Sequence, residues 1–181
     1  MRFTETRLNG VFIIEPEPIE DERGFFARTF CIREFKAHGL DPCVAQSSLS
    51  YNKKKGTLRG MHYQIPPNEE TKLVRCTSGS IYDVIVDLRP TSSTFKRWIS
   101  VVLTEENRTM LYIPKGFAHG FQTLEDETEV FYQMSEFFDP ACARGLPWDD
   151  ATLSISWLMQ PTVISRKDQS FLPLTFHRAG D

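Results

Sequence analysis

The feature that most constrains the fold of this chain is an alternation of apolar and polar residues with a period of two. Within residues 80–88, every second residue from Tyr82 onward is apolar, and Asp83 and Asp87 fall on the opposite face. The segments 98–103, 110–113 and 128–135 are also rich in β-branched and aromatic residues, and turn residues separate them. Many short strands at even spacing predict an all-β sandwich or barrel, in which a closed jelly roll hides the strand edges.

Only one segment has a convincing helical pattern, and we expect at most a few short helices. This segment is 32–38, and Gly39 closes it. The 181 residues contain no repeat, no low-complexity linker and no shift in composition. We therefore expect a single domain over residues 1–181.

The aromatic segment Gly24–Phe30 is hard to bury in so small a domain. It is either an ordinary core strand or a strand that packs against a second subunit. We expect the second arrangement, and therefore a homodimer in which the N-terminal segment packs on the partner.

Charge and cysteine content exclude several classes of protein. The net charge of −3 provides no basic face for nucleic acid, and no apolar run is long enough to span a membrane. The four cysteines lie far apart and form no Cys-x-x-Cys pair, which favours reduced thiols. We expect a soluble cytoplasmic protein that binds neither nucleic acid nor membrane.

Residues 57–64 combine a histidine with an arginine in one extended stretch. Strict alternation would place Arg59 and His62 on opposite faces of this strand. If both serve one site, the strand must be re-aimed between them, and Gly60 is the natural place for a bulge.

Two further side chains have both a structural and a functional interpretation. Lys72 shares a strand face with two apolar neighbours, so it either lines the barrel or extends along an edge to reach solvent. Tyr132 is compatible with a core tyrosine or with a hydroxyl directed into a cavity.

The histidines are too few and too scattered for a metal site. A β-barrel metal site needs two or three imidazoles and a carboxylate, often as His-x-His, but position 64 after His62 is glutamine. His119 is the only other histidine in the barrel region, since His38 lies in the predicted helix and His177 near the C-terminus. We expect no metal.

An ordered set of motifs along nearly the whole chain resembles the dTDP-4-dehydrorhamnose 3,5-epimerase family. These motifs are Arg23–Phe26, Gly56–Gln64, Lys72–Arg75, Tyr82–Arg89, Ile113–Phe121 and Ser165–Asp168. The resemblance implies a jelly roll of the cupin type and a nucleotide-diphosphate sugar as the substrate. It also implies epimerisation at C3, C5 or both carbons of a 4-keto-6-deoxy sugar, without a cofactor.

The resemblance also implies roles for individual residues. His62 is the expected base, held by Asp168, while Tyr132 returns a proton to the opposite face and Lys72 lies beside the ketone oxygen. The expected substrate-binding residues are Arg23, Phe26, Gln46, Ser48, Arg59, Lys72, His119, Phe138 and Lys167. Two alternatives stay open, namely a 3,4-ketoisomerase of nucleotide sugars and a non-catalytic sugar-binding cupin.

The chain departs from the family pattern mainly at positions that serve nucleotide recognition. Arg28 stands in place of an acidic residue, Ser48 in place of an asparagine, Phe138 in place of a stacking tyrosine, and Ala143 in place of a glutamate. A pocket that gains donors and loses acceptors should disfavour thymine. We therefore expect dTDP to bind more weakly here than to typical members of the family.

Overall fold

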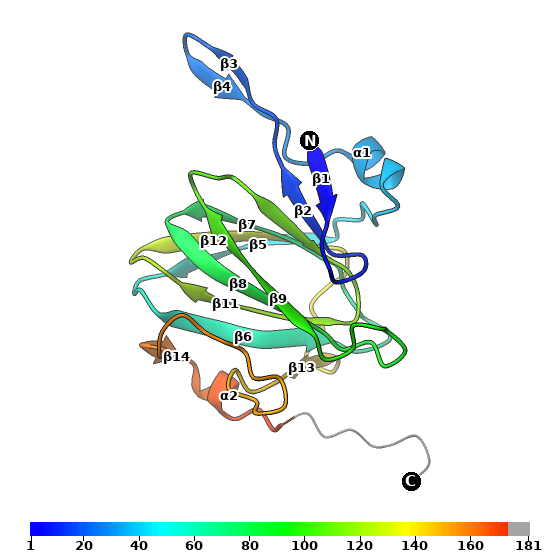
Figure 1. Ribbon diagram of the computed structural model, residues 1–181, viewed down its shortest axis with the longest axis vertical. Helices are drawn as coiled ribbons and strands as arrows, with labels where there is room; N and C mark the ends of the chain where they lie inside the picture. The colour runs from blue at the N-terminus through cyan, green and yellow to red at the C-terminus, as the bar shows by residue number, and fades with distance from the viewer. Residues whose placement is uncertain (174–181) are drawn as a thin grey trace.

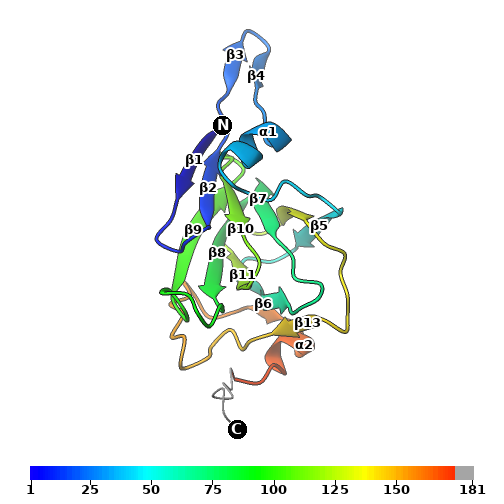
Figure 2. The same cartoon turned by 90° about the vertical axis from the view of Figure 1, so that its right-hand side faces the viewer.

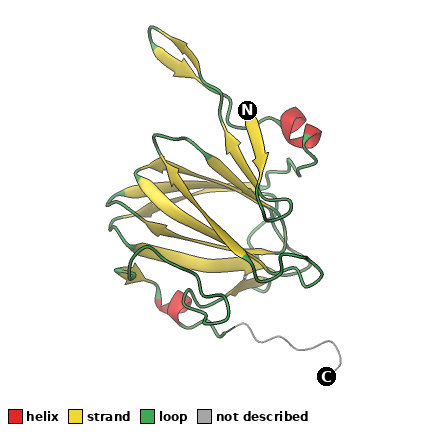
Figure 3. Ribbon diagram, in the orientation of Figure 1, coloured by secondary structure: helices red, strands yellow, loops and turns green. Residues whose placement is uncertain are grey.

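The alternating segments form the strands of two antiparallel sheets in the computed structural model, which describes residues 1–173 (Figures 1 and 3). The strands are β1 (Arg2–Glu5), β2 (Phe12–Glu15), β3 (Ile19–Asp21), β4 (Gly24–Phe26), β5 (Gln46–Asn52), β6 (Thr57–Gln64), β7 (Lys72–Ser78), β8 (Ser80–Asp87), β9 (Trp98–Thr104), β10 (Met110–Ile113), β11 (Phe117–Thr123), β12 (Thr128–Met134), β13 (Ala143–Gly145) and β14 (Val163–Ile164). The helices are α1 (Ile32–Ala37) and α2 (Arg166–Gln169). The all-β class with a few short helices is confirmed.

The two main sheets have the strand orders β1-β2-β10-β7-β12-β5 and β13-β6-β11-β8-β9. All their pairings are antiparallel, and β14 joins the second sheet parallel to β6. The strand order brings together strands that are distant in sequence, such as β7 with β12 and β6 with β11. Figure 2 shows the two sheets from the side.

The hydrophobic core fills the space between the sheets. Val74, Ile85 and Phe121 are among its buried members. The opposite face of β8 is also covered, because Tyr82, Val84 and Val86 pack against Leu146 and Leu153. The expected shared face of Tyr82, Val84 and Val86 is confirmed, and both faces of β8 are buried because the chain after β13 crosses the outside of this sheet.

Polar side chains fasten that crossing segment. Gln122, which is fully buried, donates to the Met159 carbonyl at 2.8 Å and accepts from the Met159 N–H at 3.2 Å. The Tyr82 hydroxyl donates to the Ser156 carbonyl, and the Trp98 indole donates to the Leu153 carbonyl. These contacts determine where the chain enters β14 and then α2.

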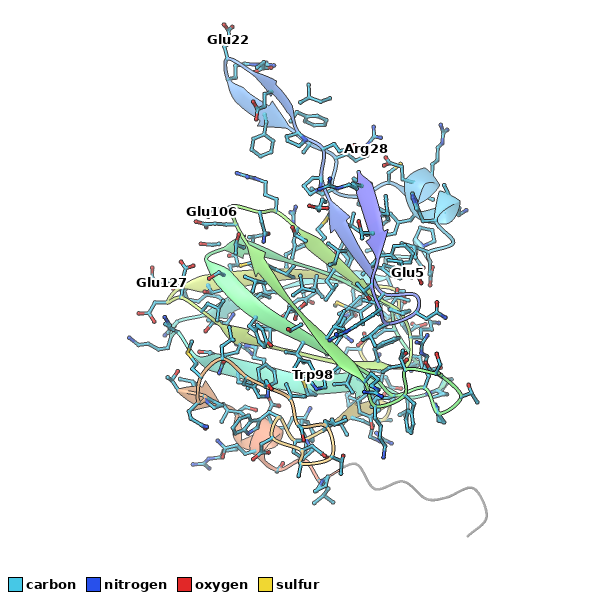
Figure 4. All side chains as sticks on the ribbon, in the orientation of Figure 1. Glu5, Glu22, Arg28, Trp98, Glu106 and Glu127 are labelled. Atoms are coloured by element: carbon cyan, nitrogen blue, oxygen red, sulfur yellow. The ribbon has the colours of Figure 1, made fainter. Side chains whose placement is uncertain are left out.

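Strands β3 and β4 form a separate hairpin that projects away from the two sheets (Figure 1), with Glu22 at its tip (Figure 4). The Phe25 side chain is 46% exposed and Phe26 is 72% exposed. The alternative that this segment is an ordinary core strand is therefore wrong for β4.

Helix α1 confirms the predicted helix within one residue. It buries Phe35 against Phe3, Phe30 and Tyr112, and it ends at Ala37 with His38 as the C-cap, after which Gly39 adopts a φ of 72°. In the described part of the chain, no helix is both long and apolar enough to cross a membrane.

Candidate active site

A bulge in β6 turns Arg59 and His62 toward the same side. On the neighbouring strand β11, His119 lies opposite His62 and Phe121 lies opposite Arg59, so β6 contains one residue more than β11 between these two pairs. Gly60 occupies the bulge with a φ of 135°, and a Cβ atom there would lie 2.5 Å from the Cα of Gly120. The predicted bulge at Gly60 is confirmed, since only glycine fits this close approach.

The bulge opens onto a cavity of about 440 Å³ that receives side chains from both main sheets. Its lining contains four groups from facing strands, His62 on β6, Lys72 on β7, His119 on β11 and Tyr132 on β12. The remaining lining residues are Gln46, Ser48, Ser50, Arg59, Tyr63, Gln64, Glu70, Phe121, Met134, Phe138, Ala143, Arg144 and Lys167. A concave site with convergent polar groups is the usual form of a small-molecule site.

His62 is paired with a carboxylate that comes from 106 residues further along the chain. Its Nε2 lies 2.8 Å from Oδ1 of Asp168, whose Oδ2 accepts a hydrogen bond from the Gly60 N–H at 3.3 Å. Ser165 caps α2 by accepting from the Asp168 N–H, which fixes the helix that carries this carboxylate. The imidazole is 44% exposed, so one edge faces the carboxylate and the rest faces the cavity.

The surroundings of Asp168 favour its charged form. Burial would raise the pKa of this carboxyl, but the hydrogen bonds from His62 and from the Gly60 N–H hold the pKa below its ordinary value. An ionised Asp168 keeps the second ring nitrogen of His62 available as a base toward the cavity.

Tyr132 and Lys72 reach the cavity from the other sheet. They lie on neighbouring strands, since Lys72 is opposite Met134 on β12, two residues from Tyr132. Burial raises the pKa of Tyr132 to about 12, so its hydroxyl stays protonated at neutral pH and can donate a proton. The structure places Lys72 in the barrel lining, and Tyr132 both lines the cavity and packs against the hydrophobic core.

A second histidine–carboxylate pair lies deeper in the cavity wall. His119 Nε2 lies 2.5 Å from Oδ1 of Asp83, both side chains are buried, and burial raises the pKa of Asp83. Sequence analysis did not identify Asp83 as a site residue. The sequence did contain one signal for Asp83. Alternation places Asp83 on the face of β8 that does not carry Tyr82, and this face contacts His119 of β11.

Most of the expected binding residues line the cavity. They are Gln46, Ser48, Arg59, Lys72, His119, Phe138 and Lys167. Gln46 also accepts a hydrogen bond from the Phe138 N–H at 3.2 Å, which positions this exposed aromatic ring at the cavity rim. Their roles in binding stay predictions.

The structure does not bring Arg23 and Phe26 to this cavity within one chain. Both lie on the projecting hairpin, where Arg23 is paired with Asp21 at 2.6 Å. Arg28 follows the hairpin at its base (Figure 4) and donates to Glu34 at 2.9 Å. Arg28 is therefore not a donor in the pocket of its own chain, whereas Ser48, Phe138 and Ala143 do line it.

Potential metal ligands do not cluster. Within residues 1–173, no group of three or more His, Cys, Asp or Glu side chains is arranged to hold an ion. His177 lies outside the described residues, and the absence of a metal stays a prediction.

Comparison with known proteins places the chain in a family. A profile described as dTDP-4-dehydrorhamnose 3,5-epimerase matches residues 5–175. The chain belongs to the dTDP-4-dehydrorhamnose 3,5-epimerase family. A relative of that name from Methanothermobacter thermautotrophicus is 43% identical over 176 residues, which cover 96% of this chain and 94% of the relative.

Two solved structures share the fold at similar identity. The Bacillus anthracis dTDP-4-dehydrorhamnose 3,5-epimerase with TDP and PPi bound has a TM-score of 0.92 and 38% identity, over 96% of this chain and 99% of that one. The dTDP-6-deoxy-D-glucose-3,5-epimerase from Legionella pneumophila, in complex with dTDP-4-keto-L-rhamnose, has a TM-score of 0.86 and 36% identity, over 92% and 89%. The predicted family and the predicted cupin-type jelly roll are confirmed.

Proposed function

We propose that this protein epimerises C3, C5 or both carbons of a nucleotide-linked 4-keto-6-deoxy sugar. The observation that carries the proposal is the pairing of His62 with Asp168 on one side of a cavity to which the opposite sheet contributes Tyr132 and Lys72. Members of the family are named after this reaction, and the Legionella relative binds a dTDP-linked keto sugar.

The chemistry follows from the groups present. His62 removes a proton from a carbon next to the ketone, and the electron pair moves onto the ketone oxygen to form an enolate. The Lys72 ammonium stabilises the negative charge that develops on that oxygen. Tyr132 then donates its proton to the opposite face of the same carbon, which inverts the configuration. No oxidant or reductant is consumed, because a proton leaves and another returns.

Solvent isotope exchange tests this function against the two alternatives. The protein is incubated with dTDP-, CDP-, UDP- and GDP-linked 4-keto-6-deoxy sugars in D₂O, and NMR follows deuterium at C3 and C5. Deuterium at one or both carbons together with the epimer is expected. A 3,4-ketoisomerase would move the carbonyl to C3, and a non-catalytic cupin would incorporate no deuterium.

We also infer that the protein is a homodimer in which the hairpin completes the partner's cavity. We further propose that residues 1–181 of each subunit form a single domain. The hairpin presents an arginine and exposed aromatic rings to solvent, an arrangement that favours contact with another chain. In such a dimer Arg23 and Phe26 of one subunit would bind the substrate of the other.

Mixing two inactive variants tests the shared site. Arg23→Ala removes the donated arginine and His62→Ala removes the base. If Arg23 acts across the interface, each mixed dimer has one complete site and one doubly defective site. Random reassortment should then restore about a quarter of the wild-type sites. If Arg23 acts within its own chain, mixing restores nothing, and light scattering gives the oligomeric state independently.

A further inference from the structure

One carboxylate in the cavity has no part in the mechanism above. Among the lining residues in the described part of the chain, Glu70 is the only acidic one. Its Oε1 accepts a hydrogen bond from the Lys72 ammonium, and its side chain is 10% exposed. A carboxylate held next to the cation of the reacting centre is positioned to contact the sugar.

The loop that carries Glu70 is fixed on both sides of this residue. After it, the Thr71 N–H donates to the Ser135 hydroxyl at 2.8 Å, and the Ser135 N–H donates to the Thr71 carbonyl at 3.1 Å. Before it, the Asn68 side chain donates to Asp139 at 2.7 Å, and Gln64 donates to the Asn68 carbonyl at 2.8 Å. The inward direction of Glu70 is therefore built into the loop.

The second oxygen of this carboxylate is an open acceptor. Within residues 1–173, no hydrogen bond reaches Oε2 of Glu70. An ionised carboxylate can only accept hydrogen bonds, so a substrate group that satisfies Oε2 must be a donor. The diphosphate is anionic and is expected near the cations Arg59, Arg144 and Lys167 instead.

The proposed sugar has few groups that can donate. Its ketone and ring oxygens are acceptors, and its methyl group is inert, which leaves the hydroxyls. With the ketone oxygen at Lys72, the nearest donor is the hydroxyl on C3, the carbon bonded to the ketone carbon. On the other side of the ketone, C5 carries the methyl group and the ring oxygen, neither of which can donate.

We propose that Glu70 is a specificity-determining residue that accepts a hydrogen bond from the C3 hydroxyl while Lys72 binds the adjacent ketone oxygen. This inference rests on the proposed function. The pair recognises a ketone with a neighbouring hydroxyl, and it sets the direction of the ring, because the reverse orientation would place the methyl group against a carboxylate.

The test compares two substrates that differ only in this hydroxyl. These are a dTDP-linked 4-keto-6-deoxy sugar and its 3,6-dideoxy counterpart, and both retain the C5 proton. The rate of deuterium exchange in D₂O, measured at C5 or at C3 if only C3 reacts, gives kcat/KM for each. The variants are Glu70→Ala and Glu70→Gln, and Glu69→Gln is the matched control because it removes a neighbouring carboxylate that does not line the cavity.

The wild-type protein and Glu69→Gln should prefer the hydroxylated substrate by about ten- to hundred-fold, as expected for a hydrogen bond to a charged group. Glu70→Ala should reduce this preference to less than about three-fold, mainly through slower exchange of the hydroxylated substrate. Glu70→Gln keeps the shape of the side chain and should lower the preference only in part. Thermal unfolding of each variant confirms that the fold is intact.

Two results would overturn the inference while leaving the proposed function standing. In the first, both substrates lose rate equally in Glu70→Ala, so that Glu70 acts on Lys72 alone. In the second, the preference is unchanged in both Glu70 variants. If the wild-type protein exchanges deuterium into neither substrate, the proposed function fails, and the inference fails with it.

Discussion

Replacing Gly60 by alanine tests whether the bulge in β6 builds the active site. The new Cβ would lie 2.5 Å from the Cα of Gly120 and 3.1 Å from the His119 carbonyl oxygen, and backbone atoms cannot rotate away as a side chain can. The φ of 135° adds a second cost, since a residue with a side chain is strained there by about 1–3 kcal/mol. Overpacking adds about 1–3 kcal/mol more. We expect the free energy of unfolding to fall by about 2–6 kcal/mol.

Gly39→Ala is the matched control for this measurement. Gly39 also has a positive φ, 72°, but no atom lies within 4 Å of its added Cβ. This variant should lose only about 1 kcal/mol, the approximate cost of the left-handed conformation. Urea unfolding of both variants and of the wild type gives the two values under the same conditions.

Activity measurements separate the effect of the bulge on the active site from its effect on the stability of the fold. Relief of the clash would shift β6 against β11 and turn either Arg59 or His62 away from the cavity. Exchange of the substrate α-proton should therefore fall at least about 100-fold in Gly60→Ala at a temperature where the variant is folded. Gly39→Ala should keep its rate. If Gly60→Ala were as stable and as active as Gly39→Ala, the close approach would not be what positions the site.

Four further predictions concern chemistry and charge. His62→Asn should lower turnover by about 10²–10⁴-fold with the melting temperature preserved, and an active variant would remove His62 from the role of base. Tyr132→Phe should still exchange the α-proton with solvent but form little epimer; equal loss of both would make Tyr132 a packing residue. Burial would raise the pKa of Asp87, but hydrogen bonds led by that from Arg89 lower it to about 2. Because the folded-state pKa is depressed, its stabilisation is complete above pH about 4 and is lost as pH falls through 2, an effect of about 2 kcal/mol. Urea unfolding between pH 5 and 2 should show a loss of stability that is smaller by this amount in Asp87→Asn than in the wild type, because Asp168 and other carboxylates with lowered pKa contribute to the slope in both. If the dimer brings Arg28 to the partner's cavity, calorimetric titration should show dTDP binding more weakly than CDP, and a clear preference for dTDP would leave Arg28 as no more than a partner of Glu34.

The strands and the bulge in β6 could be predicted from the sequence, because both depend on residues that are close together in the chain. Alternation is a property of neighbouring residues, so the segments 110–113 and 128–135 predicted β10 and β12 to within a residue. The bulge was predictable because Arg59 and His62 needed one side of a strand and Gly60 lay between them. In each case the information lies within about ten residues.

The features that sequence analysis missed depend on contacts between distant segments. Asp83 meets His119 only through the register of β8 against β11. The inward direction of Glu70 depends on hydrogen bonds to Ser135 and Asp139, more than 60 residues away. The pairing of Asp168 with His62 was predictable only through family resemblance, since nothing near either residue indicates the other.

Helix α2, which carries the carboxylate partner of His62, comes after the strands in the sequence. Every strand of the two main sheets, and also β14, precedes Asp168 in sequence. A chain that ended before Ser165 would still contain every one of these strands with His62, Lys72 and Tyr132, but it would lack Lys167 of the cavity wall and the carboxylate that pairs with His62. Truncation at this point would therefore separate the assembly of the two sheets from the pairing that orients the His62 imidazole.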